Sequence, residues 1–212
     1  MNILLVAGGK VNIEQLVQIH DTLNTPFVIG VDAGNVILDE AGIKPDKAIG
    51  DFDSVGEEVL ERLLSITDVE KLIPEKDDTD TEHAFRFALQ MKPESIVCMG
   101  CTGTRLDQTM ASINLLKLAT DDGVDSFIID ETNRIRVVRG EVRLTREDIF
   151  GKYVSVLPYY SEISHLTEKG FKYEVTDTTL DKVLSLGVSN ELVEDVGIIS
   201  SDDYMIIMET RD

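Results

Sequence analysis

The sequence is poor in basic residues and contains no long apolar run. Its 20 Lys and Arg stand against 40 Asp and Glu, which gives a formal net charge of −20. Nucleic-acid phosphates are bound by clustered basic side chains, so this imbalance argues against a nucleic-acid partner. A membrane-spanning helix needs about 18 or more apolar residues in succession, and the first residues lack the basic region of a signal peptide. We therefore expect a cytoplasmic protein with no membrane partner.

Cysteine is also scarce, which limits the possible metal and redox sites. Cys98 and Cys101 form a lone C-x-x-C at the end of an apolar run. A structural zinc site needs four ligands, and His20, His83 and His165 show no matching spacing. We expect both cysteines to be reduced, small side chains near the end of a strand.

Apolar runs and helical patterns alternate over the first 130 residues. The predicted strands are 2–7, 27–32, 47–50, 69–73, 95–99 and 126–130, and the predicted helices are 13–23, 57–64, 81–91 and 108–119. Thr79 and Glu82 have the spacing of a capping box before the third of these helices. This alternation predicts a mostly parallel sheet covered by helices on both faces.

The pattern changes from about residue 135 onward. Short strand-like runs at 135–138, 153–157, 171–175 and 204–208 are separated by turn residues, without a convincing long helix. We therefore expect an N-terminal α/β domain over residues 1–131 and a C-terminal β-sandwich domain over residues 132–212. A chain of 212 residues with 42% hydrophobic content is long enough for a core in each.

Acidic side chains follow several predicted strands at the point where each strand ends. They are Asp32, then Asp51 and Asp53, then Asp77, Asp78 and Asp80, and finally Asp107. Ligands of open parallel sheets bind outside the carboxyl ends of the strands, so we expect these groups to converge on one site. Carboxylate oxygens suit Mg²⁺, which commonly shares its ligand shell with substrate phosphates. We predict Asp51, Asp53 and Asp80 as the metal ligands, with Asp77 and Asp107 beside them.

Basic residues within these acidic motifs are candidates for phosphate contacts. Lys76 precedes Asp77, and Arg105 precedes Asp107 by two positions. The planar fork of an Arg side chain matches the oxygens of a phosphate. Gly8-Gly9-Lys10, after the first predicted strand, could expose backbone N–H groups to a nucleotide or form only a tight turn.

Ordered motifs along the chain carry a family resemblance. They are Asp32-Ala33-Gly34-Asn35, Lys44-Pro45-Asp46 leading to Gly50-Asp51-Phe52-Asp53-Ser54, Lys76-Asp77-Asp78-Thr79-Asp80, Gly100-x-x-Gly103-x-Arg105-Leu106-Asp107-Gln108, and Gly187-x-Ser189-Asn190. Over about residues 1–190 the chain resembles the thiamine pyrophosphokinase family. The resemblance implies a homodimer that transfers a diphosphate from MgATP to the hydroxyethyl group of thiamine and releases AMP.

The resemblance also implies roles for individual residues. Catalytic roles fall to Asp51, Asp53, Asp77, Asp80, Arg105 and Asp107, and binding of nucleotide or thiamine to Asp32, Gly34, Lys76, Thr79, Gly103, Ser189 and Asn190. The thiamine ring is expected near Ser189 and Asn190, between the β domain of one subunit and the α/β domain of the other. Ala33 stands where the family usually has glycine, and Gln108 where many bacterial members have histidine.

Other functions remain open from the sequence. Asp51 and Asp53 could serve a D-x-D phosphohydrolase as nucleophile and acid, although the motif follows the third predicted strand and not the first. An acidic module that binds cations or nucleotides without turnover would use the same carboxylates. A diphosphotransferase for another alcohol is a further alternative. The general base is not assigned: one of the Asp carboxylates could accept the hydroxyl proton, but Asp32 and Asp107 could equally organise hydrogen bonds.

Overall fold

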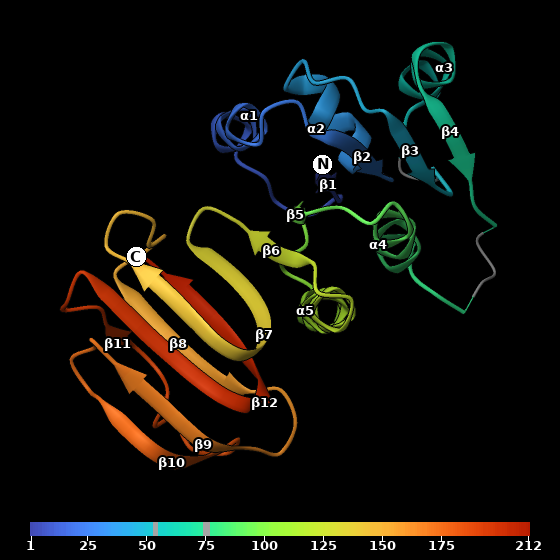
Figure 1. Ribbon diagram of the computed structural model, residues 1–212. Helices are drawn as coiled ribbons and strands as arrows, with labels where there is room; N and C mark the ends of the chain where they lie inside the picture. Colours follow the sequence, from blue (N-terminus) through green and yellow to red (C-terminus); the bar gives the residue numbers. More distant parts are fainter. Residues whose placement is uncertain (53–54, 74–76) are drawn as a thin grey trace. The chain divides into compact units, whose positions relative to one another are not determined.

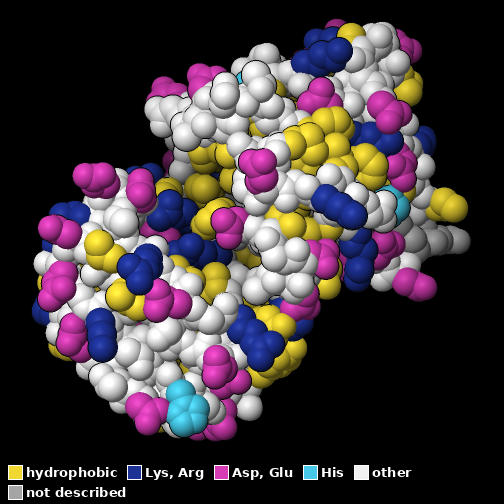
Figure 2. Space-filling model, viewed as in Figure 1, with side chains coloured by type: hydrophobic (Ala, Val, Ile, Leu, Met, Phe, Trp, Pro, Cys, Tyr) yellow, Lys and Arg dark blue, Asp and Glu magenta, His cyan; other side chains and the backbone are white. Residues whose placement is uncertain are grey.

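The computed structural model describes residues 1–52, 55–73 and 77–212 and divides into two units, Met1–Glu131 and Thr132–Asp212 (Figure 1). Each unit has its own core, and each is described by itself. Charged side chains of both signs are interspersed over the face seen in Figure 2. Among the described residues, no helix is both long and apolar enough to cross a lipid bilayer. A cytoplasmic location stays a prediction.

The first unit is built on a parallel sheet. Its strands are β1 (Asn2–Val6), β2 (Phe27–Val31), β3 (Lys47–Gly50), β4 (Asp68–Lys71), β5 (Ser95–Met99) and β6 (Asp125–Ile129), in the spatial order β6-β5-β1-β2-β3-β4. Four of the five residues of β1 are fully buried, as expected of a central parallel strand whose two faces are both covered. The predicted mostly parallel α/β architecture is confirmed.

Helices cover both faces of this sheet. They are α1 (Ile13–Thr22), α2 (Gly34–Glu40), α3 (Glu57–Ile66), α4 (Asp80–Gln90) and α5 (Leu106–Asp121). Leu16 of α1 and Leu38 of α2 pack on Leu4 and Val6 of β1. Alternate residues of the same strand, Ile3 and Leu5, are also fully buried and face the side on which α4 lies. Loops lead from β2 to α2, from β4 to α4 and from β5 to α5.

The predicted elements of this unit are present, with ends that differ by a few residues. The short helix α2 was not predicted, because seven residues that begin with Gly34 and Asn35 give little helical periodicity. The predicted capping box is half formed. Thr79 accepts a hydrogen bond from the Glu82 backbone at 3.1 Å, whereas the Glu82 side chain pairs with Arg86. Cys98 and Cys101 are free and buried at the end of β5.

The second unit is antiparallel throughout its described pairings. Its strands are β7 (Asn133–Thr145), β8 (Tyr153–Pro158), β9 (Glu162–Lys169), β10 (Val175–Asp181), β11 (Asn190–Glu191) and β12 (Val196–Thr210). The long strand β12 pairs with β7 along its length, with β9 near its start and with β8 near its end. Its register with β7 shifts between Ser201 and Met205, which separates the stretch that pairs with β9 from the stretch that pairs with β8, and buried side chains from these strands share one core. The predicted β-sandwich is confirmed.

The second unit differs from the prediction at several strands: β9, β11 and the part of β10 after Val175 were not predicted. Strand β9 was missed because Glu162, His165 and Lys169 interrupt its apolar pattern, although Ile163 and Leu166 are buried. The predicted strand 171–175 was wrong. Phe171 forms only an isolated bridge with Leu192, and β10 begins at Val175. The Phe171 side chain is buried, so its apolar signal reflected core packing and not strand pairing.

Candidate active site

Three carboxylates meet at the carboxyl edge of the parallel sheet. Asp32 follows β2, Asp51 follows β3, and Asp80 is the first residue of α4. One oxygen from each side chain lies within 4.8 Å of the others, and all three side chains are half-buried. Residues separated by almost fifty positions in the sequence are thus brought to one point by the topology of the sheet.

The backbone around Asp32 is unusual and tightly held. Asp32 has a left-handed φ of 46°, and its N–H donates to the Ile49 carbonyl at 3.0 Å. Its Oδ1 accepts a hydrogen bond from the Asp51 backbone N–H at 3.1 Å. A left-handed conformation is unfavourable for an L-residue, so the neighbouring contacts have to hold it. They aim the Asp32 side chain at the end of β3.

Crowding of negative charge changes the acidity of Asp32. Burial, followed by a hydrogen bond with Asp80 and the charges of Asp80 and Asp51, raises the pKa of Asp32 to about 7, against a smaller lowering by the Phe52 backbone. The ionised form of Asp32 is thus disfavoured by burial and by repulsion from Asp80 and Asp51. A hard divalent cation with oxygen ligands would relieve this repulsion, so the residues present fit Mg²⁺.

The segment that carries Asp80 is anchored at the start of α4. Thr79 caps the helix, and Asp80 lies in its first turn, where the helix dipole favours a negative charge. His83, one turn further on, contacts Glu70 of β4 with Nε2 to Oε1 at 2.9 Å and Asp78 with Nδ1 to Oδ2 at 3.6 Å. These contacts fix the acidic segment to the neighbouring strand.

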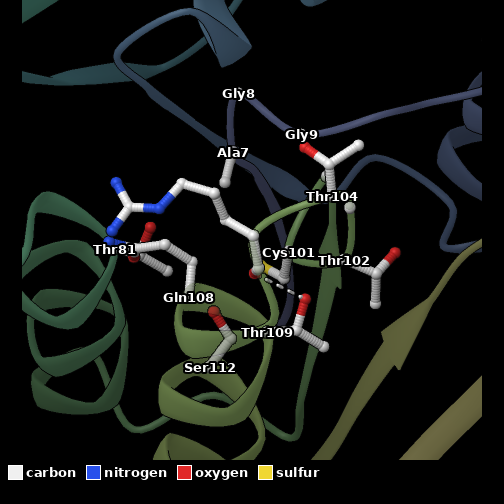
Figure 3. A pocket seen from close by; sticks show the side chains of 13 residues that line it. Ala7, Gly8, Gly9, Thr81, Cys101, Thr102, Thr104, Gln108, Thr109 and Ser112 are labelled. Atoms are coloured by element: carbon white, nitrogen blue, oxygen red, sulfur yellow. Dashed lines mark hydrogen bonds between the residues drawn. The ribbon is translucent and has the colours of Figure 1, made fainter.

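A cleft of about 290 Å³ begins beside Asp80, whose sequence neighbour Thr81 lines it. Figure 3 shows Gly8 and Gly9 after β1, Thr102 and Thr104 after β5, and Gln108, Thr109 and Ser112 on α5 around this space. A Cβ on Gly9 would lie 2.4 Å from the Gly100 carbonyl oxygen, so only glycine allows the two loops to approach so closely. Small side chains, hydroxyls and exposed backbone suit a phosphate-bearing ligand.

Arg105 and Asp107 pair with each other at the rim of this cleft. Arg105 Nη2 lies 2.5 Å from Asp107 Oδ2, and Nε donates to Oδ1 at 3.2 Å. The guanidinium lowers the pKa of Asp107, and the carboxylate raises the pKa of Arg105. The two side chains are 70% and 64% exposed, so the pair is solvated and free to exchange partners when an anion binds.

The acidic and basic residues predicted from the sequence fall into three groups in the structure. Asp51 and Asp80 join one cluster, whereas Asp77 is exposed and Asp107 pairs with Arg105. Asp53 and Lys76 lie outside the described residues. Asp32 was expected to bind nucleotide, and its carboxylate belongs to the acidic cluster. Its place directly after a strand, equivalent to that of Asp51, was the signal for this position.

Several other residues that the sequence analysis singled out lie in the loops of the first unit. Gly34 lies against β1, where a Cβ would meet the Val6 carbonyl oxygen at 1.9 Å, and Gly103 lines the cleft. Ala33 has φ −61°, a conformation open to any residue. Lys10 pairs with Glu131, with Nζ to Oε2 at 2.6 Å.

In the second unit, Ser189 and Asn190 have different roles. Ser189 is exposed, has a left-handed φ of 61°, and donates its N–H to Ser155 Oγ at 3.0 Å. Asn190 is buried, and its Nδ2 donates to Glu168 Oε2 at 2.8 Å and to the Tyr173 carbonyl at 2.9 Å. The Asn190 amide therefore holds the loop, and Ser189 is the side chain of the two that is open to a ligand.

Comparisons with known proteins agree with both units. Family models described as thiamin pyrophosphokinase, catalytic domain, and thiamin pyrophosphokinase, vitamin B1 binding domain, match residues 20–128 and 134–206. A thiamine pyrophosphokinase of Bacillus subtilis is 34% identical over 212 residues, covering 96% of this chain and 95% of that protein. A relative from Caenorhabditis elegans is 23% identical over 76% of this chain and 68% of its own.

Solved structures give the same result. The crystal structure of thiamine pyrophosphokinase from Bacillus subtilis has a TM-score of 0.88 at 30% identity and covers all of both chains. That from Geobacillus thermodenitrificans has a TM-score of 0.86 at 30% identity, covering all of this chain and 98% of its own. With both family models matched in order and a 34% identical relative of equal extent, the chain belongs to the thiamine pyrophosphokinase family.

Proposed function

We propose that the protein is a Mg²⁺-dependent ATP:thiamine diphosphotransferase, which forms thiamine diphosphate and AMP. The observation that carries this proposal is the meeting of Asp32, Asp51 and Asp80 beside the glycine-lined cleft. The family match supplies the substrate class, because the second unit matches a vitamin B1 binding domain. The acidic chain, with a net charge of −20, also suits a cationic acceptor.

ATP is proposed to bind in the cleft between the loops after β1 and β5. The Gly8 backbone N–H and the Thr104 hydroxyl are the groups that would meet phosphate oxygens, because the Gly9 N–H donates to the Gly100 carbonyl and the Thr102 hydroxyl donates to Asp130. Arg105 lines the same cleft, and its fork can turn from Asp107 to a phosphate. These contacts would orient the triphosphate for in-line attack on the β-phosphorus.

Asp32, Asp51 and Asp80 would hold Mg²⁺. When bound, the ion supplies positive charge against the phosphate oxygens. The carboxylates themselves have a second effect, because their negative charge without a cation would repel the triphosphate. Binding of cation and nucleotide is therefore expected to be mutually dependent.

The acceptor is proposed to lie at the exposed Ser189 in a homodimer. Beside it, the loop between β10 and β11 exposes a run of apolar side chains: Val183 (86%), Leu184 (61%), Leu186 (63%) and Val188 (46%). Such a concentration of exposed apolar side chains favours a protein partner, and a second copy of the chain is the partner that we propose. A site shared between two copies would bring Ser189 of one to the acidic edge of the other.

A product analysis tests the proposed reaction. Purified protein with ATP, Mg²⁺ and thiamine should give AMP and thiamine diphosphate in equal amounts by mass spectrometry, and neither when metal or thiamine is left out. ADP with thiamine monophosphate would indicate a kinase, and phosphate released without acceptor would indicate a phosphohydrolase. Nucleotide binding without any product would favour a binding module or another alcohol as acceptor.

A further inference from the structure

A fully buried amide lies directly behind the acidic cluster. Asn35, in the first turn of α2, has no exposed surface. Its Nδ2 donates to the Asp32 carbonyl oxygen at 3.1 Å, and its own backbone N–H donates to the same oxygen at 3.0 Å. Asp32 therefore has its backbone carbonyl held by two donors from one residue.

The buried Asn35 amide is destabilising, and packing of the fold does not require it. Asn35 Oδ1 is buried and has no hydrogen-bond partner among the residues that the structure describes. An unpaired buried amide oxygen is destabilising, and an apolar side chain of the same shape would avoid it. The neighbouring strand makes room for it, because a Cβ on Gly30 would lie 2.1 Å from that oxygen. Both features point to a use for the Nδ2 donor.

The use follows from the conformation of Asp32. With a φ of 46°, Asp32 leaves β2 in a left-handed turn, and this turn directs its carboxylate to the Asp51 N–H. The Asp32 N–H is tied to Ile49, and the Asp32 carbonyl is tied to Asn35. The preceding helix cap, Ala33, offers no side-chain hydrogen bond. Removal of the Asn35 amide would therefore leave one side of the strained turn held by a single backbone donor.

We propose that Asn35 is a positioning residue of the cation site: its side-chain amide locks the Asp32 backbone in the turn that brings the Asp32 carboxylate to Asp51 and Asp80. It touches neither cation nor substrate and acts only through Asp32. The inference rests on the proposed function for the reaction affected, whereas its effect on cation binding can be measured without any turnover.

The test compares Asn35→Leu, which keeps the shape and removes the donor, with Leu38→Ala. Leu38 is a fully buried residue of the same helix in the apolar core. Binding of Mn²⁺ alone is measured by the loss of the free-ion signal in electron paramagnetic resonance. We expect Asn35→Leu to bind Mn²⁺ at least tenfold more weakly with an unchanged or higher melting temperature. Leu38→Ala should melt lower and bind Mn²⁺ as the parent does.

Turnover gives a second readout. Asn35→Leu should lower kcat at least tenfold and change the KM for thiamine less than twofold, because the acceptor site is not touched. Asn35→Ala repeats the test with a smaller side chain if the Leu variant does not fold. A folded Asn35 variant with the Mn²⁺ affinity of the parent would overturn the proposal, and so would failure of both variants to fold, since Asn35 would then serve folding itself.

The outcomes separate this proposal from the proposed reaction. A parent protein that binds Mn²⁺ but makes no thiamine diphosphate would contradict the reaction and leave the role of Asn35 to be decided by Mn²⁺ affinity. A parent protein that binds no Mn²⁺ would overturn both the cation site and the positioning role.

Discussion

Gly50 and Asp32 occupy one space at the carboxyl edge of the parallel sheet. A Cβ on Gly50 would lie 1.9 Å from Asp32 Oδ1, and Gly50 has a φ of +154°. The Asp32 carboxylate therefore fills the room that the missing side chain leaves, and from there it reaches the Asp51 N–H. The glycine at the end of β3 thus determines where the acid that follows the neighbouring strand β2 points.

Gly50→Ala should displace the Asp32 carboxylate. The added methyl group meets that carboxylate and forces an unfavourable φ, so we expect a loss of about 1–3 kcal/mol in the free energy of unfolding and a Mn²⁺ affinity at least tenfold weaker. Gly123→Ala is the matched control, because Gly123 has a φ of +71° with nothing within 4 Å. It should lose stability and keep Mn²⁺ affinity. Equal Mn²⁺ binding by both variants would refute the crowding argument.

The stability of the cation-free protein should depend on pH through Asp32. Its pKa is raised from 3.8 to about 7 on folding, so between these values the folded state keeps a proton that the unfolded state has lost. The free energy of unfolding therefore falls as the pH rises from about 4 to about 7. Urea unfolding from pH 5 to 8 should show a smaller fall for Asp32→Asn. Parallel curves for the two proteins would show that Asp32 titrates normally.

Substitution of Arg105 should lower kcat/KM for ATP and hardly change the free energy of unfolding. Its pair with Asp107 is exposed, so Arg105→Lys should change the free energy of unfolding by less than about 0.5 kcal/mol. Lys lacks the planar fork, and kcat/KM for ATP should fall about tenfold, as a lost bidentate contact predicts. Arg86→Lys, which alters an exposed pair with Glu82 on α4, should leave kcat/KM unchanged. An Arg105→Lys enzyme as efficient as the parent would exclude the phosphate contact.

The apolar loop between β10 and β11 should mediate self-association. Leu184→Asp and Leu186→Asp place charges on exposed apolar positions, so sedimentation should show a shift from dimer to monomer with an unchanged melting temperature of the monomer. Leu64→Asp changes a residue on α3 that is equally exposed, at 61%, and should leave the dimer intact. A parent protein that sediments as a monomer at all concentrations would rule out the shared site.

Much of the fold could be predicted because its signals are local. Continuous apolar runs such as residues 3–6 predict buried parallel strands, and acids after several strands predict a common edge. Strand β9 was missed because the polar residues between its buried positions hide the alternation. The strand predicted at 171–175 was wrong because an apolar side chain such as Phe171 can fill a core from an irregular loop.

The location of the candidate site could be predicted from the sequence, but several of its side-chain contacts could not. Sequence position alone cannot show that Asp107 turns to Arg105, because the choice of ion-pair partner depends on side-chain conformations. The role of Asn35 was also hidden, since it depends on a left-handed φ at Asp32 and on space at Gly30. Both are properties of the folded backbone, and no residue pattern encodes them.

The central claim is that the carboxylates at this edge carry the metal-dependent reaction, and Asp51→Asn tests it most directly. The substitution removes one of three crowded charges, so the melting temperature should stay the same or rise. Formation of thiamine diphosphate and AMP, followed by mass spectrometry with ATP, thiamine and Mg²⁺, should fall at least about a thousandfold, as expected for loss of a metal ligand. A folded Asp51→Asn protein with the full activity of the parent would contradict the account.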